Sequence, residues 1–196
     1  MSRVAREFVE AIVLALIVFL VIQTGVRNFK VEGSSMLPTL EGGQYLLVNK
    51  LVYFRLDTVR LSRVVPFWKV KVEESNEWFA LRPPQRGEII VFHYPRDPTK
   101  DFVKRVIGLP GERIKVESGE VFIDGVQLEE PYLASRDTSR ARELVLRETE
   151  YYVMGDNRRG SNDSRNWGPV DVELVLGKVW FVYWPFSQVQ IIGGSP

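Results

Sequence analysis

The stretch ERIKVESGEVFIDGVQL, residues 112–128, has the residue pattern of a β-hairpin. Apolar and polar residues alternate through it, which is the period of a half-buried strand. Ser118-Gly119 and Asp124-Gly125 interrupt the alternation with residues that favour tight turns. The segment therefore predicts strands joined by a turn at each of these two dipeptides.

The same kind of short run recurs on both sides of this hairpin. The runs are separated by Gly, Pro and Asp, and they read QYLLV, GEIIVF, RIKV, EVFI, YYVM and KVWFVYW. We therefore expect a mainly β fold, with a domain of coiled antiparallel sheets over residues 29–196. Two inserts are expected in it, near residues 55–82 and 134–150.

The two expected inserts differ in composition. The first is irregular and contains Phe67, Trp68, Trp78 and Phe79, which we assign to core or loop packing, with a membrane-interface belt as the alternative. The second is polar and rich in Arg, and is expected to be a surface excursion.

The N-terminus carries a different pattern, because residues 11–22, AIVLALIVFLVI, are uninterrupted apolar and the window from Phe8 to Val26 contains only Glu10 as a charge. At about 1.5 Å per residue a helix over this window has roughly the thickness of a bilayer core, about 30 Å. We expect residues 1–28 to form a short tip and a single transmembrane anchor. A buried helix and a cleaved signal peptide are the alternatives, and Ile22, Gln23 and Thr24 offer no small-residue cleavage site.

The amino-acid composition excludes several classes of binding and catalytic site. The 26 basic and 25 acidic residues leave no basic excess of the kind that nucleic-acid binding uses. The absence of cysteine removes disulfides and thiolate nucleophiles, and a single histidine, His93, removes multi-histidine zinc sites. No pattern of acidic residues marks an orienting partner for His93, so we expect it to be structural or exposed.

A serine nucleophile needs a base nearby, and the sequence offers Ser34 and Ser35 in GSSMLPTLEGG. Lys104 lies in DFVKRVIGLPGE, where strand alternation places it on one face with Phe102 and Val106. Apolar surroundings lower the pKa of a lysine, and a decrease from about 10.4 to about 8 costs about 3 kcal/mol. Taken alone, a lysine on a strand is more often a solvated charge.

A third stretch, GDNRRGSNDSRNWGPV, begins at Gly155 and is dense in Gly, Asn, Asp and Ser. By composition it is typical of a long turn with side-chain hydrogen bonds. In a functional interpretation, Ser161 orients the lysine amine while Asp163 and Arg165 form a charge pair that braces the loop.

Together these stretches resemble the bacterial type I signal peptidases, which are membrane-anchored Ser-Lys endopeptidases. The resemblance covers residues 35–40, SMLPTL, residues 86–92, RGEIIVF, residues 101–112, DFVKRVIGLPGE, and residues 155–168, GDNRRGSNDSRNWG. The blocks occur in the family's order behind an N-terminal apolar segment.

The resemblance implies a nucleophile at Ser35 and a general base at Lys104, without a metal or cofactor. Gly33 and Ser34 fall beside the oxyanion site, and Ser161 at the position that orients the lysine. Gly33 replaces a hydroxyl residue that helps to bind the oxyanion in some members. The resemblance places structural support at Asp156, Asp163 and Arg165, and substrate pockets at Phe29, Val31, Met36, Leu40, Ile90, Asp101 and Val103.

The family further implies cleavage of signal peptides from exported preproteins after small residues, at the bacterial cytoplasmic membrane, with the catalytic domain on the extracytoplasmic side. The expected partners are preproteins and the lipid bilayer, and no nucleic acid is expected. Two rival interpretations are a self-cleaving repressor-type protease, which an apolar N-terminus disfavours, and a membrane-tethered β-rich binding protein without activity.

Overall fold

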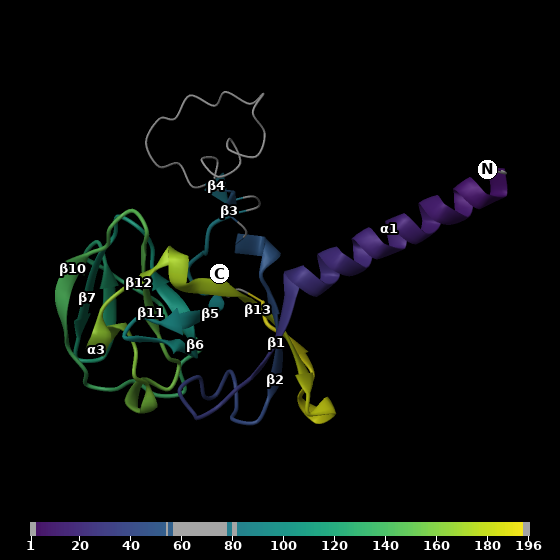
Figure 1. Ribbon diagram of the computed structural model, residues 1–196. Helices are drawn as coiled ribbons and strands as arrows, with labels where there is room; N and C mark the ends of the chain where they lie inside the picture. The colour runs from purple at the N-terminus through teal and green to yellow at the C-terminus, as the bar shows by residue number, and fades with distance from the viewer. Residues whose placement is uncertain (1–2, 54, 57–77, 80–81, 194–196) are drawn as a thin grey trace, which may run out of the picture.

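A computed structural model describes residues 3–53, 55–56, 78–79 and 82–193 of the chain. Figure 1 shows a β-rich body from which one long helix, α1, projects. Most of the insert expected near residues 55–82 lies outside the described residues. At its two ends, strand β3 (Arg55–Leu56) pairs antiparallel with β4 (Trp78–Phe79).

Within the described residues, the largest sheet has eight strands. Neighbouring strands in it follow the order β1-β2-β13-β5-β6-β11-β12, and β14 pairs with β13. Every pairing in it is antiparallel. The strands are β1 (Val26–Lys30), β2 (Tyr45–Asn49), β5 (Ile89–Tyr94), β6 (Asp97–Gly108), β11 (Glu150–Met154), β12 (Val170–Asp171), β13 (Val175–Trp184) and β14 (Gln190–Ile191). The expectation of a mainly β fold with antiparallel sheets is confirmed.

The hairpin predicted over residues 112–128 belongs to a second sheet. This sheet has four strands, in the order β10-β7-β8-β9. Its strands are β7 (Arg113–Glu117), β8 (Glu120–Ile123), β9 (Val126–Gln127) and β10 (Ala141–Val145). Both predicted turns are confirmed, because Ser118, Gly119, Asp124 and Gly125 all have φ between 50° and 84°. Two consecutive residues with positive φ are the mark of the two-residue hairpin turn.

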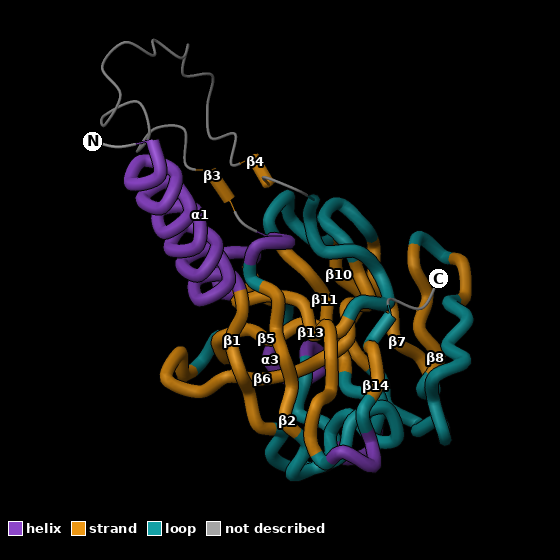
Figure 2. Tube along the Cα trace, turned by 90° about the vertical axis from the view of Figure 1, so that its right-hand side faces the viewer, coloured by secondary structure: helices purple, strands orange, loops and turns teal. Residues whose placement is uncertain are grey.

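Strand β10 lies inside the Arg-rich stretch that the sequence presents as a surface excursion. It pairs with β7, and the neighbouring Leu146 is buried against Ile114 and Val116. Figure 2 shows β10, β7 and β8 beside the larger sheet.

Strand β6 is shared between two regions of the core. Val103 packs against the cluster that contains Met36 and Leu40, whereas Phe102 and Val106 pack against the cluster with Ile90 and Phe92. Strand β5 pairs along β6 from Asp97 to Arg105, while β11 pairs with it only from Arg105 to Gly108. Among the described strands, residues 100–104 therefore keep one free edge.

The chain has one long helix, α1, and the other helical elements among the described residues are short. Helix α1 covers Arg3–Gly25, and α3 covers Ser164–Trp167. The turns of 3-10 helix are η1 (Leu51–Tyr53), η2 (Arg158–Gly160), η3 (Val172–Leu174) and η4 (Phe186–Gln188). In the part of the chain that the structure describes, no helix has the combined length and hydropathy of a membrane span.

Candidate active site

Ser35 and Lys104 lie side by side, although 68 residues separate them in the chain. The Lys104 Nζ is 2.8 Å from the Ser35 Oγ and donates a hydrogen bond to the Val103 carbonyl at 2.9 Å. Lys104 is only 4% exposed. The structure thus brings together the predicted nucleophile and the predicted base.

Burial is the main influence on the Lys104 amine. It lowers the lysine pKa to about 8, against an opposing pull from the carboxylates of Asp163 and Asp156, which favour the ammonium. Near neutral pH a substantial minority of the molecules therefore carry an uncharged amine. An uncharged amine has a lone pair that can accept a proton from a hydroxyl 2.8 Å away.

Ser35 stands in a turn that connects β1 to β2. The turn closes through hydrogen bonds from Val31 N to the Gln44 carbonyl, and from Leu40 N to the Met36 carbonyl, at 2.8 and 2.9 Å. Met36 and Leu40 are buried in the core, so the chain is anchored directly after the nucleophile. Gly33 has φ 82°, which a residue with a side chain adopts only under strain.

The third stretch, residues 155–170, packs its backbone against Ser34 and Ser35. Asn157 N donates to the Ser35 carbonyl at 3.0 Å, and the Asn157 Nδ2 donates to the Ser34 carbonyl at 3.1 Å. At Gly155, an added Cβ would overlap the Ser35 carbonyl oxygen. Sequence reasoning did not identify Asn157, and its place next to Asp156 in GDNRRGS is the only signal that the sequence offers.

The side chain of Ser161 lies close to Gly155. Its Oγ is buried without a partner among the described residues, next to Gly155. The structure therefore records no hydrogen bond from Ser161 to Lys104.

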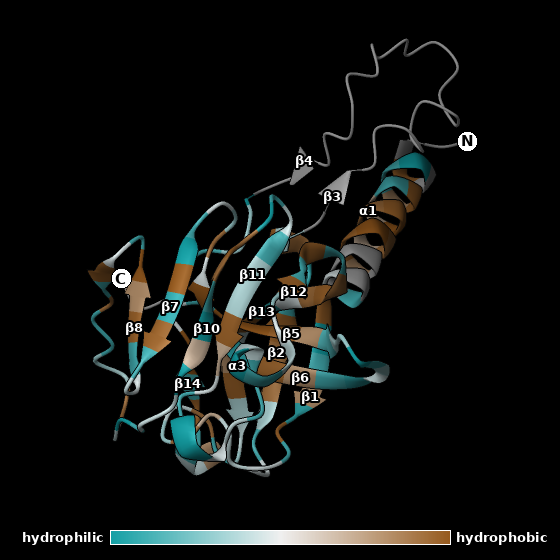
Figure 3. Cartoon of the chain, turned by 90° about the vertical axis from the view of Figure 1, so that its left-hand side faces the viewer, coloured by the Kyte–Doolittle hydropathy of each residue, from teal (hydrophilic) through white to brown (hydrophobic). Residues whose placement is uncertain are grey.

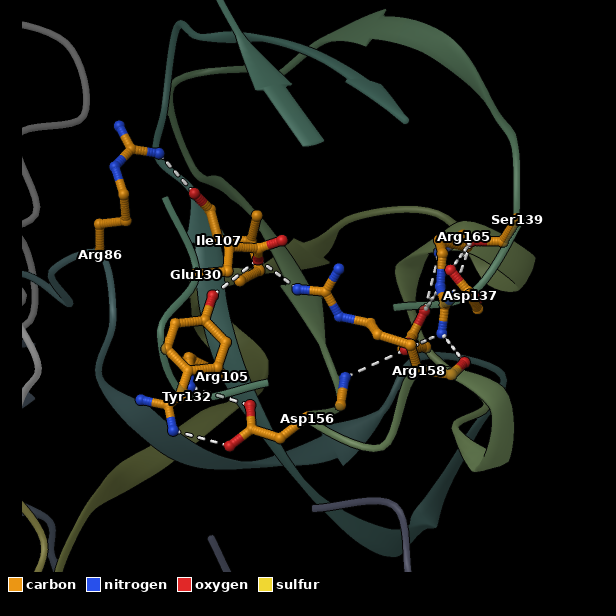
Figure 4. Close-up of polar contacts among 12 residues, drawn as sticks. Arg86, Arg105, Ile107, Glu130, Tyr132, Asp137, Ser139, Asp156, Arg158 and Arg165 are labelled. Atoms are coloured by element: carbon orange, nitrogen blue, oxygen red, sulfur yellow. Dashed lines mark hydrogen bonds and ion pairs between the residues drawn. The ribbon is translucent and has the colours of Figure 1, made fainter. Parts of the chain in front are cut away.

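Ion pairs hold the third stretch in place, as Figure 4 shows. Arg105, on the opposite face of β6 from Lys104, binds both carboxylate oxygens of Asp156, at 2.9 and 2.7 Å. Arg165 binds Asp163 at 2.8 Å and Asp137 at 2.6 Å. The contact to Asp137 ties the stretch to the connection before β10, which the sequence did not predict.

A cleft of about 600 Å³ opens beside the Ser35-Lys104 pair. Of the predicted pocket residues, Phe29, Val31, Asp101 and Val103 line it, together with Gly33 and Ser34. Met36, Leu40 and Ile90 do not line it, because they are buried in the core. The other lining residues are Lys30, Glu32, Leu46, Val91, Lys100, Phe102, Gly160 and Asn162.

His93 has a carboxylate partner that the sequence did not reveal. Its Nδ1 is 2.7 Å from Asp101 Oδ1, because the two residues pair across β5 and β6. Both side chains are about one third exposed.

Comparison with known proteins agrees with this geometry. A family model described as signal peptidase, peptidase S26, matches residues 5–184. Signal peptidase I of Bacillus caldolyticus is 37% identical over 175 residues, which cover 82% of this chain and 81% of the relative. The probable signal peptidase I-2 of Synechocystis sp. is 31% identical over 201 residues, which cover 97% and 76%.

A solved structure is also similar to part of the chain. The crystal structure of a signal peptidase I from Enterococcus faecalis is 34% identical, with a TM-score of 0.44, and covers 51% of this chain and 99% of that chain. By the family match and the identities of the two bacterial relatives, the chain belongs to the signal peptidase family, peptidase S26.

Proposed function

We propose that Ser35 and Lys104 are the catalytic pair with which this serine endopeptidase cleaves signal peptides from preproteins. The observation that carries the proposal is the 2.8 Å distance between Ser35 Oγ and a lysine amine whose pKa burial lowers to about 8. Membership of the signal peptidase family supports the substrate class.

The reaction begins when neutral Lys104 removes the Ser35 hydroxyl proton as Oγ attacks the scissile carbonyl carbon. The tetrahedral intermediate collapses to an ester on Ser35, and the leaving amine takes the proton from the Lys104 ammonium. Lys104 then deprotonates a water molecule, whose attack on the ester releases the signal peptide and restores Ser35. The residues of this chain supply every proton transfer, so the scheme requires no cofactor.

The oxyanion of the intermediate is stabilised by the Ser35 backbone N–H. Gly33 provides no side-chain hydroxyl at the position where some family members have one. Loss of one oxyanion donor typically costs about 3 kcal/mol of transition-state stabilisation, so the orientation of this N–H affects the rate strongly.

The substrate binds as an extended strand in the cleft. Phe29 and Val31 lie on the β1 side and Val103 on the free edge of β6, which offers unpaired backbone groups to a peptide. Small side chains before the cut suit the apolar part of this cleft. We assign the remaining roles as the resemblance implies them: orientation of Lys104 to Ser161, and support of the loop to Asp156, Asp163 and Arg165.

Cleavage of a purified preprotein at its signal junction by the full-length chain tests the proposal. Ser35→Ala and Lys104→Arg should each abolish cleavage, because arginine stays protonated and cannot act as a base. Ser187→Ala and Lys115→Arg are matched controls at exposed positions outside the cleft, and should cleave normally. Retained activity in Lys104→Arg would rule out the proposed base.

We also propose that residues 1–28 anchor the catalytic domain, residues 29–196, to the bacterial cytoplasmic membrane by a single pass of α1, although no helix among the described residues has the combined length and hydropathy of a membrane span. The support is that its apolar side chains from Phe8 to Phe19 are about half or more exposed, in a helix that projects from the body (Figure 3). Exposed apolar surface of this extent favours lipid.

The anchor is tested by carbonate extraction of bacterial membranes that contain the full-length chain. The chain should stay with the membranes, and Leu14→Asp with Val18→Asp should release it. Val126→Asp with Val145→Asp, at exposed apolar positions of the body, is the matched control and should change nothing. Release of the unmodified chain by carbonate would contradict the anchor.

The side of the membrane is tested separately. With the catalytic domain on the extracytoplasmic face, protease added to intact spheroplasts should digest residues 29–196. Digestion only after lysis would place the domain in the cytoplasm.

A further inference from the structure

We propose that the side-chain amide of Asn157 aims the Ser35 N–H at the reacting carbonyl oxygen, so that Asn157 is a positioning residue for the oxyanion donor. The inference rests on the proposed role of Ser35 as the nucleophile. It concerns a residue that does not line the cleft and for which no hydrogen bond to Ser35 Oγ or Lys104 is recorded among the described residues.

The contacts of Asn157 fix the direction of its amide. Its Oδ1 accepts a hydrogen bond from Gly160 N at 3.3 Å, as the cap of η2. Its Nδ2 donates to the Ser34 carbonyl at 3.1 Å, and its backbone N donates to the Ser35 carbonyl at 3.0 Å. One residue therefore holds the two successive carbonyls at the nucleophile.

The Ser34 carbonyl and the Ser35 N–H are the two ends of one peptide unit. In a planar trans peptide these groups point in opposite directions, so a hydrogen bond that holds the carbonyl also sets the direction of the N–H. Because the Ser34 carbonyl points toward Asn157, the Ser35 N–H points away from Asn157. Ser34 and Ser35 line the cleft, whereas Asn157 does not. Among the described residues, no acceptor is recorded for this N–H, so it is available to a ligand.

Two donors hold this peptide unit, because Leu37 N also donates to the Ser34 carbonyl, at 3.2 Å. Gly33, at φ 82°, precedes this peptide unit, and glycine allows rotations that other residues resist. A hydrogen bond to the carbonyl opposes rotation of the unit and also polarises it, which strengthens the N–H as a donor. Asn157 thus stabilises the transition state through the peptide unit that it holds.

The test compares Asn157→Asp and Asn157→Ala with the unmodified full-length chain. Asn157→Asp keeps the oxygen that caps η2 and replaces the donor by an acceptor, while Asn157→Ala adds no charge. Asn49→Asp is the matched control, because the Asn49 Oδ1 also accepts from backbone N–H groups, at Leu51 and Val52, but Asn49 does not line the cleft. Rates are measured at about pH 9.5, above the Lys104 pKa, so that a nearby charge does not change the protonation of the base.

Two inhibitors of the same peptide sequence separate positioning from general loss of structure. A peptide aldehyde adds to Ser35, forming a bond from Oγ to the aldehyde carbon while the hydroxyl proton moves to the former carbonyl oxygen, which remains an acceptor for the Ser35 N–H. A reduced-amide analogue has CH₂ in place of the carbonyl and makes no such contact.

Both Asn157 variants should lower kcat/KM by about 10- to 100-fold and weaken the aldehyde by a similar factor, with KM nearly unchanged. The reduced-amide analogue should bind within about twofold of its affinity for the unmodified chain, and Asn49→Asp should match that chain throughout. Thermal unfolding shows whether each Asn157 variant is folded. If one variant does not fold, the kinetics of the other variant test the proposal.

The inference is overturned if kcat/KM stays within about threefold in a folded Asn157 variant, or if aldehyde and reduced amide weaken equally. An unmodified chain that does not cleave, or a Ser35→Ala chain that does, would instead reject the proposed function.

Discussion

The chemistry that we propose for this chain depends on one buried lysine, Lys104. The alternation in DFVKRV predicts that Lys104 lies among apolar neighbours, and the structure confirms its burial. The contacts of Ser34 and Ser35 with Asn157 could not be predicted in the same way, because 123 positions separate Asn157 from Ser34 and no periodic pattern connects them. The assignment of Met36, Leu40 and Ile90 to the pocket followed motif position, whereas their apolar side chains are more stable in the core.

Burial of Lys104 should lower the stability of the folded state near neutral pH. The folded pKa, about 8, lies below the ordinary 10.5, so the unfolded chain binds more protons between these values and stability rises with pH across them. Lys104→Met should therefore raise the free energy of unfolding by up to about 3 kcal/mol at pH 7, and by much less above pH 10.5.

Urea denaturation at the two pH values measures this difference. Lys115→Met, at an exposed lysine of β7, is the control and should change stability by about 0.5 kcal/mol or less. An equal gain from Lys104→Met at both pH values would show that the amine is not desolvated.

Among the elements, the strands of the hairpin over residues 112–128 and the part of β6 around Lys104 follow from the sequence, while the start of β6 and the whole of β10 do not. Strand β6 begins at Asp97 and contains Pro98, which usually argues against a strand. Pro98 is tolerated because β11 pairs with β6 only from Arg105, so that one edge near Pro98 needs no donor. Strand β10, ARELV, can carry Arg142 and Glu143 because these side chains are exposed, while Ala141 and Leu144 pack on the core.

The two hairpin glycines should respond differently to substitution. Gly119 and Gly125 have φ of 81° and 84°, so alanine is strained at both, by about 1 kcal/mol. At Gly119 a Cβ would also overlap the Asp137 carbonyl, whereas at Gly125 it meets nothing within 4 Å. Gly119→Ala should therefore cost at least about 1 kcal/mol more than Gly125→Ala in denaturant unfolding. Equal losses would contradict the packing of β8 against the connection before β10.

Glu88 joins three elements at the start of β5. It accepts hydrogen bonds from Tyr53 of η1, from Lys178 of β13 and from Arg82, at distances of 2.5–3.0 Å. Burial raises the pKa of this carboxyl, but the hydrogen bonds outweigh burial and lower it to about 2.

The lowered pKa gives Glu88 a stabilising effect that is fully present above pH 4.5 and is lost as pH falls through about 2. Glu88→Gln should reduce the free energy of unfolding by about 3 kcal/mol at pH 7, and the difference should shrink steadily in acid. If the difference in free energy of unfolding between the two chains did not change with pH, the charge of Glu88 would not contribute to stability.

At the scale of the whole molecule, a buried polar network joins the connection between β9 and β10 to the stretch of residues 155–168. Arg158 pairs with Glu130, which also accepts a hydrogen bond from the Tyr132 hydroxyl at 2.7 Å (Figure 4). The Tyr132 ring lies 4.0 Å from the Arg105 guanidinium. The order of strands and this network involve partners distant in sequence, so the sequence did not predict them.

Removal of one charge from this network should be costly. Glu130→Gln leaves the buried Arg158 without its counter-charge, and should destabilise the chain by about 3–5 kcal/mol. Glu130→Leu with Arg158→Met removes both charges and should be much less destabilised than the sum of Glu130→Leu and Arg158→Met alone, as a double-mutant cycle of these three variants would measure. A double variant as unstable as the sum of the single ones would exclude this coupling.

The central claim is that an uncharged Lys104 takes the proton of Ser35. The measurement that tests it most directly is the pH dependence of kcat/KM for preprotein cleavage by the full-length chain. Activity should rise about tenfold per pH unit in the acid limb and level off above pH 8, the pKa to which burial lowers this lysine. A rate that is independent of pH from about 6 to 10, or one that still rises through the pKa of an ordinary lysine, would contradict the account.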